Sequence, residues 1–379
     1  MQYLRLMVLR ISVCFSVTFF SSFSAYASDA TVDKLSISSK IEQLELKQMS
    51  SVLVQHKNKL VFEQYYNGTK RHDLHDIRSA SKSITSLMLG IAIEQGKIPS
   101  LDSKVRPYFK DYEPVLFDSP AKQNMTFFEL LSMTNPLECD DWNNFSSGHE
   151  ERMYLQADWI QFVLNLPERG PAPWEPRDAD QKYGRDFSYC TAGISLTAAA
   201  IERAVDKGFD DYAHEHLFNP LGIKQVQWAY SPKGITQGGG GLRIKPIDFL
   251  KLGQLMLNKG QWNNQSIVPK QWVDKSLTRY SVSMPDMNAE YGLTWWVFDF
   301  EVADFEITDF EKVGKNTEQK QATPQKVSAF AAAGNGGNYL FFVPEQELAV
   351  VITSTAYNTP YMHQQAHQIF SQVVLPSIL

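Results

Sequence analysis

Cysteine is scarce in this chain of 379 residues, which contains only three. None of them forms a C-x-x-C pair, the spacing typical of structural zinc sites, so the sequence implies no metal. Cys14 lies near the N-terminus, which leaves Cys139 and Cys190 in the body of the chain. This pair is compatible with one disulfide bond and equally with two buried thiols.

A hydrophobic run long enough to cross a membrane is missing as well. Two arginines precede an apolar run over residues 11–20, and Ala25-Tyr26-Ala27 matches an A-x-A cleavage site. The run is shorter than the roughly 20 residues that a spanning helix needs. We therefore predict a signal peptide at residues 1–27 and one mature domain at residues 28–379. The mature protein is then periplasmic or secreted, with no stable membrane insertion after cleavage.

Positive charge is also in short supply. The chain has 36 Lys and Arg against 42 Asp and Glu, a net charge of −6. The predicted signal takes away two arginines and no acidic residue, which leaves 34 basic and 42 acidic residues and a net charge of −8. No basic stripe remains to neutralise phosphates, and this argues against nucleic acid and anionic membrane surfaces as partners.

Strand patterns occupy both ends of the chain, and helical patterns lie between them. Residues 51–54 and 60–66 predict one hairpin, and residues 339–343 with 348–353 predict another. Residues 84–95 are apolar on nearly all sides, which is typical of a buried central helix. The two ends must therefore meet in one sheet, and we predict an α/β (α+β) fold with an inserted helical lobe.

The stretch RSASKS places Ser79 and Lys82 three residues apart, where a polar run becomes apolar. On a helix the two side chains share a face, and burial of the lysine would lower its pKa until the neutral amine can accept the serine proton. Alternatively, Ser79 is an ordinary helix N-cap. The same spacing recurs at Ser119 and Lys122, where a proline follows the serine and no buried helix does. The spacing alone leaves both interpretations open.

Segments spread over most of the chain carry a family resemblance. They are LVFEQYYNG, RSASKSITSLMLGIAIEQGKIPSLDSKV, FELLSMTNPLECDDW, FSYCTAG, QGGGGLRIKPIDFLKLGQLMLNKGQW and GNGGNYLFFVPEQELAVVI. In this order and spacing they resemble the serine β-lactamase and penicillin-recognising enzyme superfamily. Within it, the resemblance is to the branch of class C β-lactamases, D-aminopeptidases, esterases and 6-aminohexanoate-dimer hydrolases. It implies the β-lactamase/transpeptidase-like fold, an antiparallel sheet flanked by helices with an inserted all-helical lobe.

The resemblance also implies roles for individual residues. Ser79 is the expected nucleophile and Lys82 its proton acceptor, and Tyr189 of the element Tyr189-Cys190-Thr191 shares the proton transfer. Thr191 stands where relatives have an asparagine whose carboxamide binds the substrate amide. We therefore predict Thr191 as a substrate-binding residue, and the replacement weakens the case for a lactam substrate.

A glycine-rich stretch replaces the third element of the family, which is usually K-T-G or H-x-G. Gly334 and Gly336 stand there and are predicted to border the substrate, but the cation that would hold a substrate carboxylate is missing. Glycines permit a close approach of the backbone, so the N–H of Ser79 and that of either Gly337 or Asn335 are predicted to form the oxyanion hole. A β-bulge is the alternative explanation of these glycines.

The segment ECDDW follows a helix that leads, in relatives, into the wall of the active-site cleft. Trp142 is therefore predicted to line the acyl pocket, with a place in the core as the alternative. The same placement brings Cys139 near the element that contains Cys190. The resemblance thus favours a disulfide between the two, which would fix the Tyr189 segment to the cleft wall.

From the sequence we predict an exported serine hydrolase that acts through an acyl-enzyme on small esters or amides, without a cofactor. The nearest alternative is a β-lactamase or D,D-peptidase that acts on cell-wall-like substrates. A second alternative is a binding protein that kept the fold and lost the chemistry. The sequence makes no prediction of the oligomeric state.

Overall fold

A computed structural model describes residues 34–170, 186–284, 289–302 and 325–379, which belong to one compact unit. The predicted signal, residues 1–27, lies outside these ranges. None of the helices within them is both long and apolar enough to span a membrane.

The central element is an eight-stranded sheet with the order β2-β1-β13-β12-β11-β10-β9-β8. All of its described pairings are antiparallel. The strands are β1 (Met49–His56), β2 (Lys59–Tyr65), β8 (Ser281–Met284), β9 (Ala289–Tyr291), β10 (Trp296–Val302), β11 (Gln325–Gly334), β12 (Asn338–Val343) and β13 (Leu348–Ser354).

Both predicted hairpins are present in this sheet. Lys57 and Asn58 join β1 to β2 with φ of 48° and 61°, the left-handed values that a tight two-residue hairpin turn requires. The strand from the N-terminal region pairs directly with the last strand of the chain, so that Val52 lies opposite Ile352. The sheet is therefore completed only by residues from both ends of the sequence.

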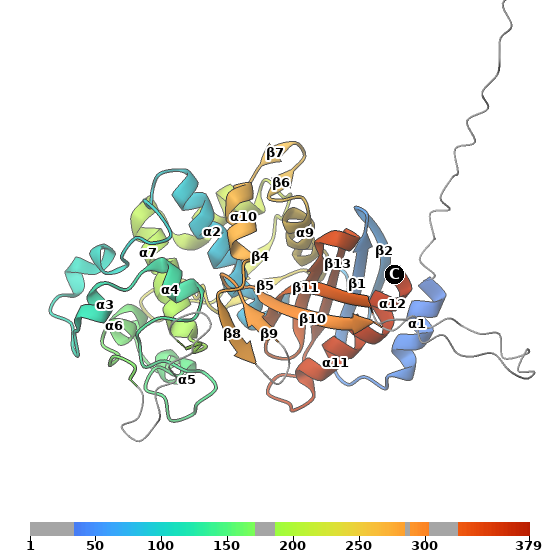
Figure 1. Cartoon of the computed structure of the whole chain (residues 1–379), viewed down its shortest axis with the longest axis horizontal. Helices are drawn as coiled ribbons and strands as arrows, with labels where there is room; N and C mark the ends of the chain where they lie inside the picture. Colours follow the sequence, from blue (N-terminus) through green and yellow to red (C-terminus); the bar gives the residue numbers. More distant parts are fainter. Residues whose placement is uncertain (1–33, 171–185, 285–288, 303–324) are drawn as a thin grey trace, which may run out of the picture. The chain divides into compact units, whose positions relative to one another are not determined.

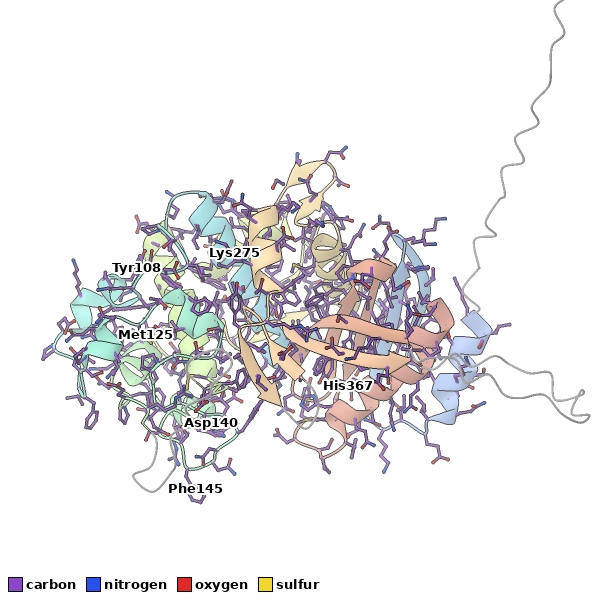
Figure 2. The ribbon with its side chains drawn as sticks, viewed as in Figure 1. Tyr108, Met125, Asp140, Phe145, Lys275 and His367 are labelled. Atoms are coloured by element: carbon purple, nitrogen blue, oxygen red, sulfur yellow. A yellow bond between two sulfur atoms is a disulfide. The ribbon has the colours of Figure 1, made fainter. Side chains whose placement is uncertain are left out.

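Helices cover the sheet (Figure 1). Helix α9 (Pro246–Leu257), which starts with proline at its first position, packs on β1, β12 and β13. The terminal helices are α1 (Lys34–Gln43), α11 (Met362–Gln368) and α12 (Leu375–Ile378), and a π-helical stretch (Ile369–Val374) separates the last two. His367 lies on α11 (Figure 2). Its ring packs edge-on against those of Phe298 and Phe341, at 4.7 and 5.5 Å between centroids. Burial lowers its pKa to about 4, so the imidazole stays neutral against the sheet.

The segments between the terminal strands form the predicted helical lobe, which Figure 1 shows beside the sheet. Helices α4, α5, α6 and α8 pack around α7. The helices are α3 (Pro120–Gln123), α4 (Phe127–Leu131), α5 (Glu150–Tyr154), α6 (Trp159–Leu164), α7 (Thr191–Val205), α8 (Phe209–Ala213) and α10 (Lys270–Ser276). Two small sheets complete the fold, one of β3 (His75–Asp76), β5 (Leu242–Ile244) and β4 (Val226–Trp228), the other of β6 (Gln261–Trp262) and β7 (Gln265–Ser266).

Helix α2 (Lys82–Glu94) lies between the lobe and the sheet and is the predicted central helix. Every residue from Lys82 to Ala92 is buried. A helix that is apolar on all sides is stable only when other elements surround it. Here α7 and α10 pack against it, so the start of α2 is held firmly in the interior.

Candidate active site

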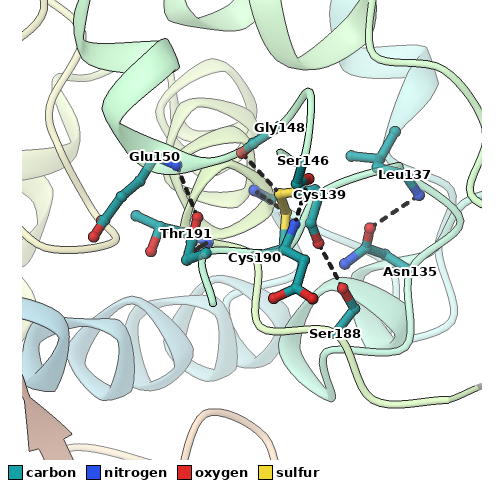
Figure 3. Close-up of a disulfide and its surroundings, with 12 residues drawn as sticks. Asn135, Leu137, Cys139, Ser146, Gly148, Glu150, Ser188, Cys190 and Thr191 are labelled. Carbon is teal, nitrogen blue, oxygen red and sulfur yellow. Dashed lines mark hydrogen bonds between the residues drawn. A yellow bond between two sulfur atoms is a disulfide. The ribbon is translucent and has the colours of Figure 1, made fainter. Parts of the chain in front are cut away.

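A disulfide joins two of the segments that build the site. Cys139 and Cys190 are bonded, with 5.3 Å between their Cα atoms and 51 positions between them in the sequence (Figure 3). Cys190 occupies the N-cap of α7, where its sulfur accepts a hydrogen bond from the N–H of Gly193 at 3.2 Å. The bridge thus ties the start of α7, and Tyr189 before it, to the segment that contains Asp141.

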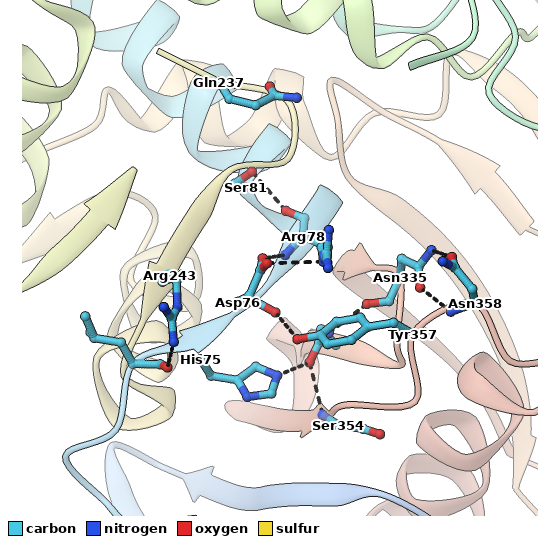
Figure 4. Close-up of polar contacts among 12 residues, drawn as sticks. His75, Asp76, Arg78, Ser81, Gln237, Arg243, Asn335, Ser354, Tyr357 and Asn358 are labelled. Atoms are coloured by element: carbon cyan, nitrogen blue, oxygen red, sulfur yellow. Dashed lines mark hydrogen bonds and ion pairs between the residues drawn. The ribbon is translucent and has the colours of Figure 1, made fainter. Parts of the chain in front are cut away.

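The turn that carries Ser79 joins β3 to α2. Residues Arg78–Ser81 form a 3-10 turn, in which Arg78 has a φ of 51°, an uncommon value for a residue with a side chain. The N–H of Arg78 donates to the Asp76 carboxylate at 2.9 Å, and its Nε lies 3.2 Å from the same carboxylate (Figure 4). Asp76 therefore stabilises the strained backbone position immediately before Ser79.

Ser79 does not cap helix α2. The N-cap position is Ser81, and the Ser79 hydroxyl accepts a hydrogen bond from Lys82 Nζ at 2.8 Å. The same amine donates to the carbonyl of Gly239 at 2.5 Å. Lys82 is 1% exposed, and this burial lowers its pKa to about 8, although the carboxylates of Glu150 and Asp141 act in the opposite direction. The neutral amine that proton transfer requires is thus populated near pH 8.

Tyr189 lies beside this pair. Lys82 Nζ is 4.8 Å from the centre of the Tyr189 ring, and the phenol lies near the Ser79 hydroxyl, which acts on the pKa of Tyr189 in the lowering direction. Burial raises the pKa of Tyr189 far above its ordinary value, so the phenol remains protonated. Of the two groups near Ser79, Lys82 is the one that titrates in the physiological range, and Tyr189 can relay a proton while it stays neutral.

The carboxylates of Asp141 and Glu150 lie close enough to Lys82 to affect its charge. Asp141 accepts hydrogen bonds from the N–H groups of Thr191 at 2.7 Å and of Glu150 at 2.9 Å, and its own N–H donates to the Tyr189 carbonyl at 2.8 Å. Burial and the nearby Glu150 carboxylate raise the pKa of Asp141 to about 6. Asp141 therefore positions the backbone on both sides of Cys190 and adds negative potential next to Lys82.

A chain of hydrogen bonds holds the Gly239 carbonyl in place for Lys82. The Tyr154 hydroxyl donates to Glu150 at 2.9 Å and accepts from the Gln237 amide at 2.9 Å. The Gln237 oxygen in turn accepts from the N–H of Gly239 at 2.7 Å and from the Ser195 hydroxyl at 2.9 Å. Gly239 tolerates no side chain, because a Cβ would lie 2.8 Å from the Thr191 methyl group.

Thr191 and Trp142 occupy different environments. Thr191 is fully buried at the start of α7, and its hydroxyl has no hydrogen-bond partner within the described part of the chain. Trp142 is 52% exposed and stacks on Tyr189, with 5.4 Å between ring centroids, and it also lies 6.2 Å from Trp296. Trp142 thus forms an aromatic wall over Tyr189. The predicted contacts of both residues with a substrate stay predictions.

The last residues of strand β11 lie against the turn Arg78–Ser81, which contains Ser79 and is called the nucleophile turn below. The pairing of β11 with β10 ends at Ala331, whereas its pairing with β12 continues to Gly334, which lies opposite Asn338. A Cβ on Gly334 would come within 2.1 Å of the Ile77 carbonyl oxygen and 3.1 Å of the Ala80 nitrogen. Only glycine permits this approach, and it places the backbone at the end of β11 against the turn that contains Ser79.

The next three residues have contacts elsewhere. Asn335 exchanges hydrogen bonds with Asn358, Gly336 lies against the ring of Tyr357, and Gly337 lies against the carbonyl of Met362. Among the four predicted residues, it is Gly334 whose backbone the structure brings to the nucleophile turn. An oxyanion role for Gly337 or Asn335, and substrate contacts of Gly334 and Gly336, stay predictions.

Sequence reasoning missed the groups that surround Lys82. Glu150, Tyr154 and Gln237 received no role. These residues lie far apart in the sequence and match no short motif. Within the described ranges, no group of three or more His, Cys, Asp or Glu side chains is arranged to hold a metal ion.

Comparisons with known proteins identify the family of the chain. The family model described as Beta-lactamase matches residues 41–373. A curated relative, the 6-aminohexanoate-dimer hydrolase of Paenarthrobacter ureafaciens, is 21% identical over 243 residues, which cover 62% of this chain and 59% of that protein. The match thus spans less than two thirds of the length of that relative.

Solved structures show the same fold. The penicillin-binding protein from Bacillus halodurans superposes with a TM-score of 0.62 at 15% identity, covering 89% of this chain and 99% of that one. A class C β-lactamase from Rhodobacter sphaeroides gives 0.57 at 16% identity, covering 90% and 98%. The predicted fold, an antiparallel sheet flanked by helices with a helical lobe, is confirmed.

Proposed function

The chain belongs to the beta-lactamase family, and from this premise we propose that it is a serine hydrolase that forms an acyl-enzyme with small amides or esters. The proposal rests above all on the 2.8 Å hydrogen bond between Lys82 Nζ and Ser79 Oγ in a site where burial lowers the pKa of the lysine to about 8. A neutral amine at this distance can accept the hydroxyl proton as Ser79 attacks.

The reaction then follows from the neighbouring groups. Ser79 Oγ bonds to the substrate carbonyl carbon, and its proton passes to Lys82. The negative oxygen of the tetrahedral intermediate is stabilised by backbone N–H groups of the nucleophile turn and of the adjoining β11–β12 segment. Lys82 and Tyr189 return the proton to the departing amine or alcohol, and the carbonyl re-forms. A water molecule then attacks the carbonyl carbon of the acyl-enzyme by the same steps, and Ser79 Oγ is the leaving group.

An amide is the first substrate to test. The curated relative is named for the hydrolysis of a 6-aminohexanoate dimer, which contains an amide between two linear units. Here the glycines at Gly334 and Gly336 supply no cation at the position where penicillin-recognising relatives often have one, which argues for a linear amide or ester over a β-lactam. Faster turnover of nitrocefin than of linear amides and esters would reverse this order.

Covalent labelling tests the proposal directly. A fluorophosphonate should add once to the mature protein, and peptide fragmentation should place the adduct on Ser79. Lys82→Ala and Tyr189→Ala should label more slowly, because each removes a group that takes up the serine proton. The control is Ser119→Ala, which should label like the wild type. A folded protein without any adduct would favour a non-catalytic binding protein of the same fold.

Export is part of the proposal and has its own test. The chain should be recovered from a periplasmic or secreted fraction with an N-terminus at position 28, which intact mass measures. Recovery of the unprocessed chain from the cytoplasm would contradict it. The proposal includes no nucleic acid partner, no stable membrane insertion and no cofactor.

A further inference from the structure

Residues 335–337 join β11 to β12 beside the nucleophile turn and are called the β11–β12 turn below. Gly336 and Gly337 have φ of 90° and 82°, so this turn is built from the residue type with the greatest backbone freedom. Backbone N–H groups stabilise an oxyanion well only when they are oriented before the reaction begins. Groups outside the turn must therefore fix its conformation if its N–H groups are to serve the proposed oxyanion hole.

The side chain of Asn338 holds the β11–β12 turn from inside the protein. Asn338 is the first residue of β12 and is fully buried. Its amide nitrogen donates to the Asn335 carbonyl at 2.7 Å, at the start of the turn. Its amide oxygen accepts from the Ser354 N–H at 3.0 Å and lies 2.8 Å from His75 Nε2 (Figure 4). A buried amide with three partners has one favoured orientation, and here it connects segments that are far apart in the sequence.

The partners of Asn338 also determine which atom donates at His75. A backbone N–H can only donate and a carbonyl can only accept, so the Ser354 N–H faces the amide oxygen and the Asn335 carbonyl faces the amide nitrogen. His75 Nε2 therefore carries a hydrogen and donates to the amide oxygen of Asn338. Burial lowers the pKa of His75, so the ring is neutral at pH 7 and Nε2–H is its one N–H donor.

These contacts reach the segment that leads into the nucleophile turn. His75 lies on β3, four residues before Ser79. A second link runs through Tyr357, whose hydroxyl donates to the Asp76 carbonyl at 3.1 Å. The ring of Tyr357 lies so close to Gly336 that a Cβ there would come within 2.6 Å of it. The β11–β12 turn and the residues before Ser79 are thus held by one network.

We propose that Asn338 is a positioning residue which, together with His75, holds the β11–β12 turn against the nucleophile turn, so that the N–H groups of the oxyanion hole are in place before a substrate binds. This inference rests on the acyl-enzyme chemistry of Ser79 and adds to it a residue that touches neither the substrate nor the nucleophile. Loss of the Asn338 amide releases the Asn335 carbonyl, and the two glycines that follow then let the turn change its conformation.

Two esters that differ in one atom test the proposal. In 4-nitrophenyl acetate the reacting carbonyl has oxygen, and in O-4-nitrophenyl thionoacetate sulfur replaces it. Because sulfur accepts hydrogen bonds weakly, an oxyanion hole accelerates the oxygen ester more than the thiono ester. The ratio of kcat/KM for the oxygen ester over that for the thiono ester therefore reports on the hole. A smaller fraction of folded protein lowers both rates alike and leaves this ratio unchanged.

Asn338→Ala should lower this ratio about tenfold, because the N–H groups are displaced rather than removed. The matched control is Gln365→Ala, which removes another buried amide, one that bonds to the backbone N–H and carbonyl of Lys47. The control should leave the ratio unchanged. His75 supplies a second pair of variants in case Asn338→Ala does not fold. His75→Leu removes one donor and should lower the ratio by less, whereas His75→Gln keeps a donor and should preserve it.

Hydrogen exchange separates this proposal from the proposed function. In Ser79→Ala, which cannot form an acyl-enzyme, added Asn338→Ala should speed the exchange of amides at 334–337 at least about tenfold, and added Gln365→Ala should not. His75→Leu replaces Asn338→Ala there if the latter does not fold.

If exchange rises in this way while the wild type hydrolyses no ester or amide, the positioning role stands and the hydrolase proposal fails. If the wild type hydrolyses esters and neither Asn338→Ala nor His75→Leu lowers the ratio, the positioning role is refuted. Without hydrolysis, unchanged exchange at 334–337 refutes it as well. Thermal unfolding monitors the folding of each variant.

Discussion

The chain contains two S-x-x-K motifs in very different settings. Lys82 and Lys122 are both buried, 1% and 3% exposed, and burial lowers the pKa of both. At the first motif the lysine amine donates to Ser79 Oγ at 2.8 Å. At the second, the backbone N–H of Lys122 donates to Ser119 Oγ at 3.2 Å, and the amine donates to the carbonyls of Leu116 and Phe117. Burial of the lysine therefore does not distinguish the two motifs.

What distinguishes the motifs is the use of the serine oxygen. Ser119 has extended backbone geometry and caps helix α3, with Pro120 as the first helical residue. Ser79 instead lies inside a 3-10 turn, and the helix that follows begins with the lysine itself. Because a 3-10 turn precedes Lys82, the Ser79 side chain points toward the lysine amine and does not cap the helix backbone.

Paired serine replacements should give the largest contrast. Ser79→Ala should lower kcat/KM for any substrate at least about ten-thousandfold, since the nucleophile is lost. Ser119→Ala should keep full activity and lose about 1 kcal/mol of stability with its helix cap. Kinetics and urea unfolding measure the two effects. Similar losses of activity in both variants would remove the distinction between the motifs.

The disulfide supports only the first motif, so its removal should affect the two regions differently. Cys139→Ser with Cys190→Ser opens a loop of 51 positions and should lower the free energy of unfolding by about 4 kcal/mol. Hydrogen exchange should increase around Tyr189 and remain slow at Ser119–Asn124, which lies outside the loop. Equal loss of protection in both regions would show that the bridge stabilises the whole lobe rather than the Tyr189 segment.

Paired lysine replacements should sharpen the comparison further. Lys82→Met should reduce kcat/KM about a hundred- to a thousandfold, because a general base is lost. Lys122→Met should leave activity intact and cost about 1–3 kcal/mol of stability, since two backbone carbonyls lose their buried donor. If the Lys82→Met variant stays active, Tyr189 and not Lys82 is the general base.

The smallest effect concerns pH. The wild-type kcat/KM for a neutral ester should rise with pH through a midpoint near 8, because only neutral Lys82 accepts a proton. Of the two carboxylates, Glu150 raises the pKa of Lys82 more than Asp141 does. Glu150→Gln should therefore move the midpoint to lower pH by up to about one pH unit, while the new amide can still accept the hydrogen bond of Tyr154. A midpoint that stays or rises would contradict the assignment of Lys82 as the titrating base.

The elements that the sequence predicts well are those with a strong local pattern. The two hairpins and the buried helix α2 follow from alternation, turn residues and an apolar run. The pair Ser79 and Lys82 was visible as a spacing, and its interpretation as a nucleophile with its base came from the family resemblance. Tyr189 came from the resemblance alone, because an aromatic residue before a helix has no pattern of its own.

The polar surroundings of the site could not be predicted from the sequence. The Gln237 oxygen accepts from the N–H of Gly239, whose carbonyl accepts from Lys82. A residue pattern cannot predict such a backbone carbonyl contact. The pairing of Asp76 with the strained Arg78 depends on a single φ angle. Arg243 on β5 lies opposite Asp76 on β3, more than 150 positions earlier in the sequence. Only tertiary packing brings such groups together.

The pairing of β1 with β13 has a consequence for the order in which the protein matures. Strand β1 can pair with β13 only after the C-terminal region has been synthesised, because Val52 lies opposite Ile352, 300 positions later. The end of β11 that packs on the nucleophile turn is made late as well. Most of the chain is therefore synthesised before the end of β11 can pack against the turn that contains Ser79. Contacts between residues so far apart in the sequence also make folding slow. The surroundings of Ser79 are therefore complete only when nearly the whole chain is available to fold.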